Sequence, residues 1–202
     1  TLFAYNLQPE VYSFRLLDAL VHEARGEGVT NFPIHIKLDT GMHRLGFDPV
    51  RDIDELVRSL KEQKALLPIS VFSHFVGADE TLFDEFTEHQ ADLFSRGADT
   101  LQKAFRHHIL RHVCNSAATE HFPDYQMDMV RLGLGLYGIA PRNNRMIHPV
   151  SQLTTTILQI HELGAGETIG YGRHTTLARP SRIAAIPIGY ADGLNRRLGN
   201  RA

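Results

Sequence analysis

The sequence predicts an α/β fold: part of a TIM-type (β/α)8 barrel, with about five of the eight strands, followed by the start of a β-rich C-terminal domain. Over residues 1–146, short apolar runs alternate with amphipathic stretches in units of roughly 30 to 40 residues, as in parallel strands joined by crossover helices. After about Pro149, β-branched residues and a Gly164–Ala165–Gly166 turn replace that pattern. We therefore expect two domains, 1–146 and 147–202, with a linker over 141–149.

Each element follows from its local pattern. The apolar runs of the first part predict strands at 2–5, 34–38, 69–75, 109–114 and 130–136. Helical periodicity predicts one helix after Pro9 that ends near Gly26 and a second after Pro49. A third, long helix is expected over 81–105, and a short turn or helix over 122–127. In the second part, strands are expected over 152–160 and 183–188.

The composition is that of a globular protein and excludes several classes of partner. Hydrophobic residues make up 43% of the chain and charged residues 22%, far from the composition of a disordered chain. The net charge of -2 argues against nucleic acid or an anionic membrane as the main partner. No apolar run approaches the roughly 20 residues of a membrane helix. The single cysteine, Cys114, fits a reducing cytoplasm.

Polar residues stand where four of the predicted strands end: Lys37, His74, Asn115 and Arg131. In a barrel of parallel strands these ends meet at one rim, where the chemistry of such folds takes place. Gly133 permits a ligand to approach the backbone closely, and Arg44 can hold an anion at any physiological pH. The residues alone therefore predict a phosphorylated ligand at the rim, and go no further.

Motifs along nearly the whole chain, in order, resemble those of the alanine racemase family. They are HIKLDTGMHRLGF (35–47), FSHFVGADE (72–80), HVCNSAAT (112–119), MVRLGLGLYGIAP (129–141), GETIGYGR (166–173) and IPIGYADGLNRR (186–197). Leu132 and Asn195 depart mildly, since the family often has proline at both positions. The resemblance implies a bacterial, cytoplasmic, homodimeric enzyme that uses pyridoxal 5'-phosphate to interconvert L- and D-alanine for peptidoglycan synthesis.

The resemblance also implies catalytic roles for three residues. Arg131 would face the pyridine nitrogen of the cofactor and, because arginine keeps its proton, would leave that nitrogen unprotonated. His74 would hydrogen-bond Arg131 and fix it. Tyr171 would be one of two bases on opposite faces of the substrate, reaching into the other subunit's barrel. Without the motifs, His74 is more simply a structural histidine at a strand end, and Tyr171 a tyrosine in a glycine-rich hairpin.

Further residues would bind the cofactor and the substrate. The phosphate would lie against Asn115, Ser116 and the backbone of Gly133 and Leu134. Arg44 would contact the cofactor phenolate and the substrate carboxylate. The family often carries a carbamate on the lysine at the Lys37 position; otherwise Lys37 is a partly buried cation. The channel by which substrate enters would include Asp79, Tyr190 and Arg196.

One expected group is missing. In the family, the lysine that binds the cofactor as a Schiff base follows the first barrel strand, and nothing in this sequence matches that segment. The chain begins at Thr1 without a methionine, on an apolar run, and stops at Ala202 directly after a Gly-Asn-Arg turn, so both ends look cut and we expect a fragment. Without that lysine, we expect that the fragment alone cannot racemise alanine. No metal site is expected, since the 12 histidines have no metal-binding spacing.

Three alternatives stay open. The full protein could act on serine, lysine or a broad set of amino acids. It could instead be a non-catalytic barrel that binds pyridoxal phosphate, although such proteins should lack the GYG and GYADG motifs. The chain could also be one domain of a larger fused polypeptide.

Overall fold

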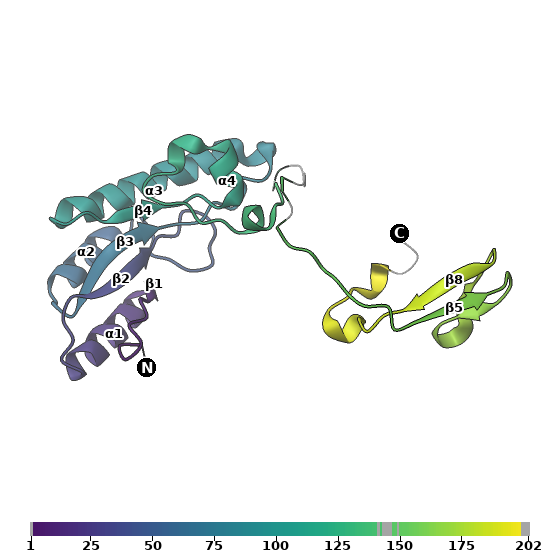
Figure 1. Cartoon of the computed structure of the whole chain (residues 1–202). Helices are drawn as coiled ribbons and strands as arrows, with labels where there is room; N and C mark the ends of the chain where they lie inside the picture. The colour runs from purple at the N-terminus through teal and green to yellow at the C-terminus, as the bar shows by residue number, and fades with distance from the viewer. Residues whose placement is uncertain (1, 141, 143–146, 149, 199–202) are drawn as a thin grey trace. The chain divides into compact units, whose positions relative to one another are not determined.

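The structure is a computed structural model that describes residues 2–140, 142, 147–148 and 150–198. The chain divides into two compact units, Thr1–Val150 and Ser151–Ala202 (Figure 1). The linker expected over 141–149 lies largely outside the described residues.

A parallel sheet of four strands forms the centre of the first unit. The strands are β1 (Glu10–Val11), β2 (Phe32–Lys37), β3 (Leu66–Phe72) and β4 (Leu110–His112). They lie in the sheet in the same order as in the sequence, and each pairs in parallel with the next. This is the arrangement of successive strands in a (β/α)8 barrel, so the predicted α/β class is confirmed. No closed barrel forms within the described residues.

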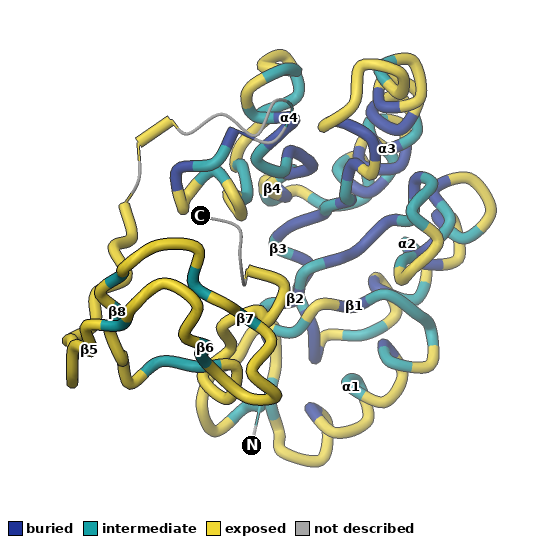
Figure 2. Tube along the Cα trace, turned by 90° about the vertical axis from the view of Figure 1, so that its right-hand side faces the viewer, coloured by how far each residue is buried: buried dark blue, intermediate teal, exposed yellow. Residues whose placement is uncertain are grey.

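Four α-helices accompany this sheet: α1 (Phe14–Gly26), α2 (Ile53–Lys61), α3 (Asp84–Ala104) and α4 (Ser116–His121). The first three contact β3 and lie along the same side of the sheet (Figure 2). The Ser13 side chain accepts a hydrogen bond of 3.3 Å from the amide of Leu16, which explains why α1 begins at Phe14. Helix and sheet bury one apolar core, in which Leu17, Ile34 and Phe94 are nearly inaccessible.

The strand predicted at 2–5 is wrong. These residues form a turn, in which the amides of Asn6 and Leu7 donate to the carbonyls of Phe3 and Leu2. Asn6 has a positive φ of 51°, which is incompatible with a strand. The apolar side chains of this turn pack against the core instead, since the Phe3 ring packs edge-on against Phe32. The first strand, β1, begins after Pro9.

The strand predicted at 130–136 is also wrong. A short 3-10 helix, η3 (Leu134–Tyr137), occupies its second half. The amides of Gly133 and Gly135 donate to the Ser116 hydroxyl at 2.7 and 3.1 Å instead of to a neighbouring strand. Two further 3-10 turns, η1 (Thr81–Phe83) and η2 (Pro123–Tyr125), lie in this unit.

The second unit is built from β-hairpins. Strand β5 (Gln159–Leu163) pairs antiparallel with β8 (Ser181–Ala185), and β6 (Thr168–Ile169) pairs antiparallel with β7 (Thr175–Thr176). The 3-10 turns of this unit are η4 (Tyr171–Arg173), η5 (Tyr190–Asp192) and η6 (Arg196–Leu198). The β character predicted after Pro149 is confirmed, but the strand predicted at 152–160 is mostly wrong, since residues 152–158 form no strand and β5 begins only at Gln159. The strand predicted at 183–188 is shifted by two to three residues, to β8. None of the described residues here is buried within the chain.

Candidate active site

A buried arginine is the centre of the site in the first unit. The Arg131 backbone amide donates to the carbonyl of Cys114 just beyond β4, which turns the side chain across the ends of β3 and β4. Its Nη1 contacts the Nδ1 atom and the carbonyl oxygen of His112 at 2.7 and 3.1 Å. Its Nη2 lies 2.6 Å from the Ser73 carbonyl and 3.3 Å from Nδ1 of His74. Within the described residues Nε makes no hydrogen bond, so it stays available to a ligand.

The partners of Arg131 fix the tautomers of the two histidines. A guanidinium can only donate, so Nδ1 of His112 must accept and Nε2 must carry the proton. That Nε2 lies 3.2 Å from the Ser70 hydroxyl, which lies 2.6 Å from Nδ1 of His35. His35 in turn contacts the Gln8 side chain at 3.0 Å through Nε2. The result is one directed chain of hydrogen bonds across β4, β3 and β2, in which Arg131 is the first donor and the Gln8 side-chain oxygen is the last acceptor.

The electrostatics keep both histidine partners neutral. Burial, followed by the charge of Arg131, lowers the pKa of His74 to about 4. Burial and Arg131 also lower the pKa of His112 to about 4. Burial lowers the pKa of Arg131 itself, but arginine starts so high that it stays charged near neutral pH. The site therefore holds a cation whose contacts are carbonyls and neutral imidazoles, and in the part of the chain that the structure describes no carboxylate is among its hydrogen-bond partners.

A cavity of ≈ 540 Å³ lies beside Arg131. It is lined by most of the residues predicted to bind the cofactor, together with apolar neighbours: Met42, His74, Phe75, Val76, Asp79, Asn115, Ser116, Ala117, Arg131, Leu132, Gly133 and Leu134. Asn115 is rigid here, since its Oδ1 caps α4 at 3.0 Å and its Nδ2 donates to the Phe75 carbonyl at 3.0 Å. The structure thus brings His74, Asp79 and Arg131 together with the predicted phosphate cradle.

A second cavity of ≈ 450 Å³ shares His74 and Arg131 with the first and adds Lys37 and Arg44. Lys37 is buried at the end of β2, and its Nζ lies 4.9 Å from the centre of the Phe72 ring. The Arg131 guanidinium carbon lies 5.3 Å from the same ring. Burial, Arg44 and Arg131 all act to lower the pKa of Lys37, while Glu10 acts to raise it, and the net direction is down.

The other predicted residues lie in the second unit. Tyr171 is 98% exposed and begins η4, between the paired strands β6 and β7. Tyr190 is also exposed, and the Arg196 guanidinium stacks 5.4 Å from its ring. Each unit is described by itself, so these three residues are placed only within the second unit.

Sequence reasoning missed three residues that support the site. His112 holds Arg131, Gln90 braces the segment that carries His74, and Glu10 pairs with Lys37. The Gln90 side chain is inaccessible; its Nε2 donates to the hydroxyl of Thr40 and the carbonyl of His74, both at 3.2 Å. A signal existed for His112, since it stands within a predicted strand close to the polar end. Gln90 reads as an ordinary polar helix residue.

The family follows from comparison with known proteins. The model of the alanine racemase N-terminal domain matches residues 1–141, and that of the C-terminal domain matches 150–202. The chain belongs to the alanine racemase family. Alanine racemase 1 of Clostridium acetobutylicum is 34% identical over 207 residues, covering 100% of this chain and 53% of that protein. Alanine racemase 2 of Bacillus subtilis is 38% identical over 176 residues, covering 83% of this chain and 44% of its own length.

Solved alanine racemases share the fold. The structure from E. faecalis is 33% identical and superimposes with a TM-score of 0.82 over 98% of this chain and 53% of its own. The structure from Bartonella henselae, which has covalently bound pyridoxal phosphate, is 25% identical with a TM-score of 0.75 over the same shares. The chain therefore spans about half the length of the alanine racemases that it matches. Within the described residues, no helix is both long and apolar enough to cross a membrane.

Proposed function

We propose that the protein containing this chain interconverts L- and D-alanine with pyridoxal 5'-phosphate. The observation that carries the proposal is the Arg131 guanidinium, which neutral partners hold by its Nη atoms while Nε stays free of hydrogen bonds within the described residues. A permanently charged donor of this kind favours an unprotonated ring nitrogen. Family membership supports the reaction, and the cavity beside Arg131 supports the cofactor.

The residues present fit the cofactor. The Ser116 hydroxyl already accepts from two backbone amides, so its hydrogen points outward for a phosphate oxygen. A side chain at Gly135 would come within 3.3 Å of Ser116, so glycine keeps this cradle open. Ser116, Asn115, Gly133 and Leu134 would hold the phosphate, with Arg131 at the ring and Arg44 at the phenolate. When bound, pyridoxal phosphate makes the α-proton of an amino acid acidic enough to be removed.

The positions of Arg131 and His74 would set the protonation state of the cofactor ring nitrogen. A neutral His74 adds no second positive charge at the ring, and its Nδ1 contact with Arg131 fixes the guanidinium plane. By leaving the ring nitrogen unprotonated, Arg131 would keep the electron withdrawal by a bound cofactor weak, so that return of the α-proton would be favoured over side reactions. Arg44 would orient the carboxylate of the substrate, so that the α-carbon faces a base on each side.

Tyr171 would be one of those bases. Its ring is almost fully exposed, so the hydroxyl is free to serve a site outside its own unit. We propose that it does so in the barrel of a second subunit, which makes the protein a homodimer with shared sites. Tyr190 and Arg196, already stacked, would narrow the channel by which substrate enters, together with Asp79 of the other subunit, and thereby favour a small amino acid.

The opposite base would be a lysine that these 202 residues do not supply. The chain has four lysines, namely Lys37, Lys61, Lys64 and Lys103. Lys37 pairs with Glu10, and none of the other three lines either cavity beside Arg131. We therefore propose that the 202 residues alone are inactive. We also propose a cytoplasmic location and a role in peptidoglycan synthesis, which the single reduced cysteine and the family support.

The test is racemisation of L-alanine by the full-length protein with pyridoxal phosphate, followed by circular dichroism. Tyr171→Phe should lower kcat at least about 100-fold while cofactor absorbance is retained. Tyr5→Phe, an exposed tyrosine of the first unit, is the matched control. Equal or faster turnover of serine or lysine would move the assignment to another amino-acid racemase. Cofactor binding without turnover of any amino acid would favour a non-catalytic carrier.

A further inference from the structure

A β-bulge between β2 and β3 turns a polar side chain toward a buried serine. The register of the two strands runs Ile34 with Pro68 and then His35 with Ser70, so the pairing skips Ile69. A bulge re-aims the side chains that follow it, and bulges are common next to active sites. Without the skipped residue, His35 would stand opposite an isoleucine. The bulge instead brings Nδ1 of His35 to 2.6 Å from the Ser70 hydroxyl.

Ser70 connects two histidines that lie on neighbouring strands. It is 1% exposed, and its hydroxyl lies 3.2 Å from Nε2 of His112 on β4. Because Nδ1 of His112 accepts from Arg131, its Nε2 carries the proton and donates to Ser70. A hydroxyl has one proton of its own to donate, and in a buried place that proton needs an acceptor. Nδ1 of His35 is that acceptor, so Ser70 accepts once and donates once.

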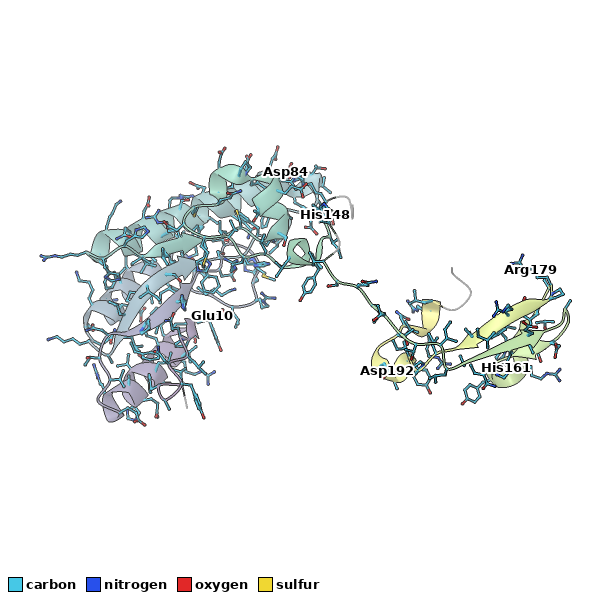
Figure 3. The ribbon with its side chains drawn as sticks, viewed as in Figure 1. Glu10, Asp84, His148, His161, Arg179 and Asp192 are labelled. Atoms are coloured by element: carbon cyan, nitrogen blue, oxygen red, sulfur yellow. The ribbon has the colours of Figure 1, made fainter. Side chains whose placement is uncertain are left out.

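The surroundings of His35 keep it neutral and able to accept. Glu10 of β1, labelled in Figure 3, lies opposite His35 in the pairing of β1 with β2. Burial lowers the pKa of His35 and Glu10 acts to raise it, and the net direction is down. Its Nε2 donates to the Gln8 side-chain oxygen at 3.0 Å, which leaves Nδ1 without a proton. A protonated His35 would donate through both nitrogens and leave the Ser70 proton without this acceptor.

The His112 ring has two orientations that share one plane. The ring stacks on Phe72, with the two ring centres 4.9 Å apart and the planes 6° apart, so stacking fixes the plane of the imidazole. Stacking does not distinguish the orientations that a half-turn about the Cβ–Cγ bond exchanges, and the turned ring would offer a carbon in place of Nδ1. The contact of Nε2 with Ser70 selects the orientation in which Nδ1 faces Arg131 at 2.7 Å. The hold on Arg131 therefore depends on Ser70 as well as on His112.

We propose that Ser70 and His35 are positioning residues, which hold His112 in the orientation and tautomer that present Nδ1 to Arg131 and thereby fix the Arg131 guanidinium. In the part of the chain that the structure describes, Ser70 lines neither cavity beside Arg131, so it acts through His112. The inference rests on the proposed function for its effect on turnover, because Arg131 would face the cofactor ring. The effect on Arg131 itself can be measured without any turnover.

The experiment measures rotation of the Arg131 guanidinium about its Nε–Cζ bond in the full-length protein, labelled with 15N-arginine. This rotation exchanges Nη1 with Nη2, which have different partners in the structure. The exchange rate is read by 15N NMR, and Arg131→Lys assigns the signals. Urea unfolding of each variant confirms that it is folded.

The variants form two matched pairs. Ser70→Ala removes the hydroxyl, and Ser70→Thr keeps it. His35→Leu removes the acceptor of the Ser70 proton, and His35→Asn keeps an acceptor near the place of Nδ1. Ser95→Ala is the control, since the Ser95 hydroxyl donates to the Ala91 carbonyl within α3. If Ser70→Thr does not fold, the His35 pair decides the question.

We expect Ser70→Ala and His35→Leu to raise the exchange rate about tenfold, because each removes one hydrogen bond from the chain that holds Arg131. Ser70→Thr, His35→Asn and Ser95→Ala should stay within about twofold of the wild type. In racemisation of alanine, kcat should fall about tenfold in Ser70→Ala and His35→Leu, with KM nearly unchanged.

An exchange rate that neither Ser70→Ala nor His35→Leu changes would overturn the proposal. Equal rates in Ser70→Ala and Ser70→Thr would overturn it as well, since packing rather than the hydroxyl would then set the rate. Faster exchange with unchanged kcat would overturn the role of the two residues in the reaction. A wild type that holds Arg131 as described but racemises no amino acid would count against the proposed function alone.

Discussion

Gln90 offers the sharpest test of how the site is supported. This residue of α3 is fully buried, and its side chain makes three hydrogen bonds: two tie the helix to the segment after β3, and one ties it to Thr40 after β2. Its Nε2 donates to Thr40 and to the His74 carbonyl, and its Oε1 accepts from the Val76 amide, all at 3.2 Å. Gln90→Leu keeps the volume but leaves the carbonyl and the amide without this partner.

The expected cost can be worked from these contacts. A net loss of about 1 kcal/mol for each hydrogen bond gives about 3 kcal/mol in total. With a urea dependence of about 2 kcal/mol per molar, the midpoint of unfolding should fall by about 1.5 M. Gln126→Leu is the control, since the Gln126 side chain makes one hydrogen bond, to the Thr119 carbonyl, and should cost about 1 kcal/mol.

A double-mutant cycle separates the network from simple packing. Thr40 lies 2.8 Å from the Ser73 hydroxyl as well as contacting Gln90. The costs of Thr40→Val and Gln90→Leu should therefore add to more than the cost of the double variant, by about 1 kcal/mol. Gln90→Leu with a midpoint within about 0.2 M of the wild type would refute the reasoning, because three hydrogen bonds of a fully buried side chain cannot be lost without consequence.

Three further predictions follow from the site. The pKa of His112 is lowered to about 4 in the folded chain, so the unfolded chain binds more protons than the folded chain between about pH 6.5 and 4. The free energy of unfolding should therefore fall as the pH falls through that window. His112→Asn should flatten this part of the plot of urea midpoint against pH. Ser116→Ala should weaken pyridoxal phosphate binding to the full-length protein about tenfold in a fluorescence titration, whereas the control Ser95→Ala in α3 should not. If Ser116→Ala bound the cofactor as tightly as the wild type, Ser116 would not be part of the phosphate cradle. Burial raises the pKa of Cys114 to about 11, so the thiol should resist iodoacetamide at pH 8 until urea unfolds the chain, and rapid labelling of the native chain would contradict its placement.

The sequence predicted the elements whose patterns are local. The helix from Phe14 to Gly26 has an N-cap serine and a regular apolar face, and β2 and β3 are mostly apolar segments between turns. The two strands that were predicted wrongly, at 2–5 and 130–136, are apolar runs whose backbone amides form turns or bind a side chain instead of pairing with a strand. Asn6 closes a turn through its positive φ, and the amides after Arg131 are taken by Ser116. Neither event is visible in hydrophobic periodicity, because one depends on the backbone conformation of Asn6 and the other on the distant Ser116 hydroxyl.

The residues of the candidate site could be predicted where they belong to a family motif. Contacts between side chains that are far apart in the sequence could not be predicted. His74 and Arg131 are 57 residues apart in the sequence, and only the family resemblance predicted their contact. The Glu10 contact with Lys37 depends on the register of β1 against β2, which the sequence does not specify. Gln90 is 50 residues from Thr40, and the pattern of α3 shows it as one polar residue among many.

The central claim is that Arg131 holds the cofactor ring without protonating it. The most direct measurement is the 15N chemical shift of ring-labelled pyridoxal phosphate in the full-length protein, with free cofactor at low and high pH as references. We predict the shift of a neutral pyridine nitrogen near pH 8, altered in Arg131→Gln. A shift typical of a protonated pyridinium, or one that the substitution leaves unchanged, would contradict the account.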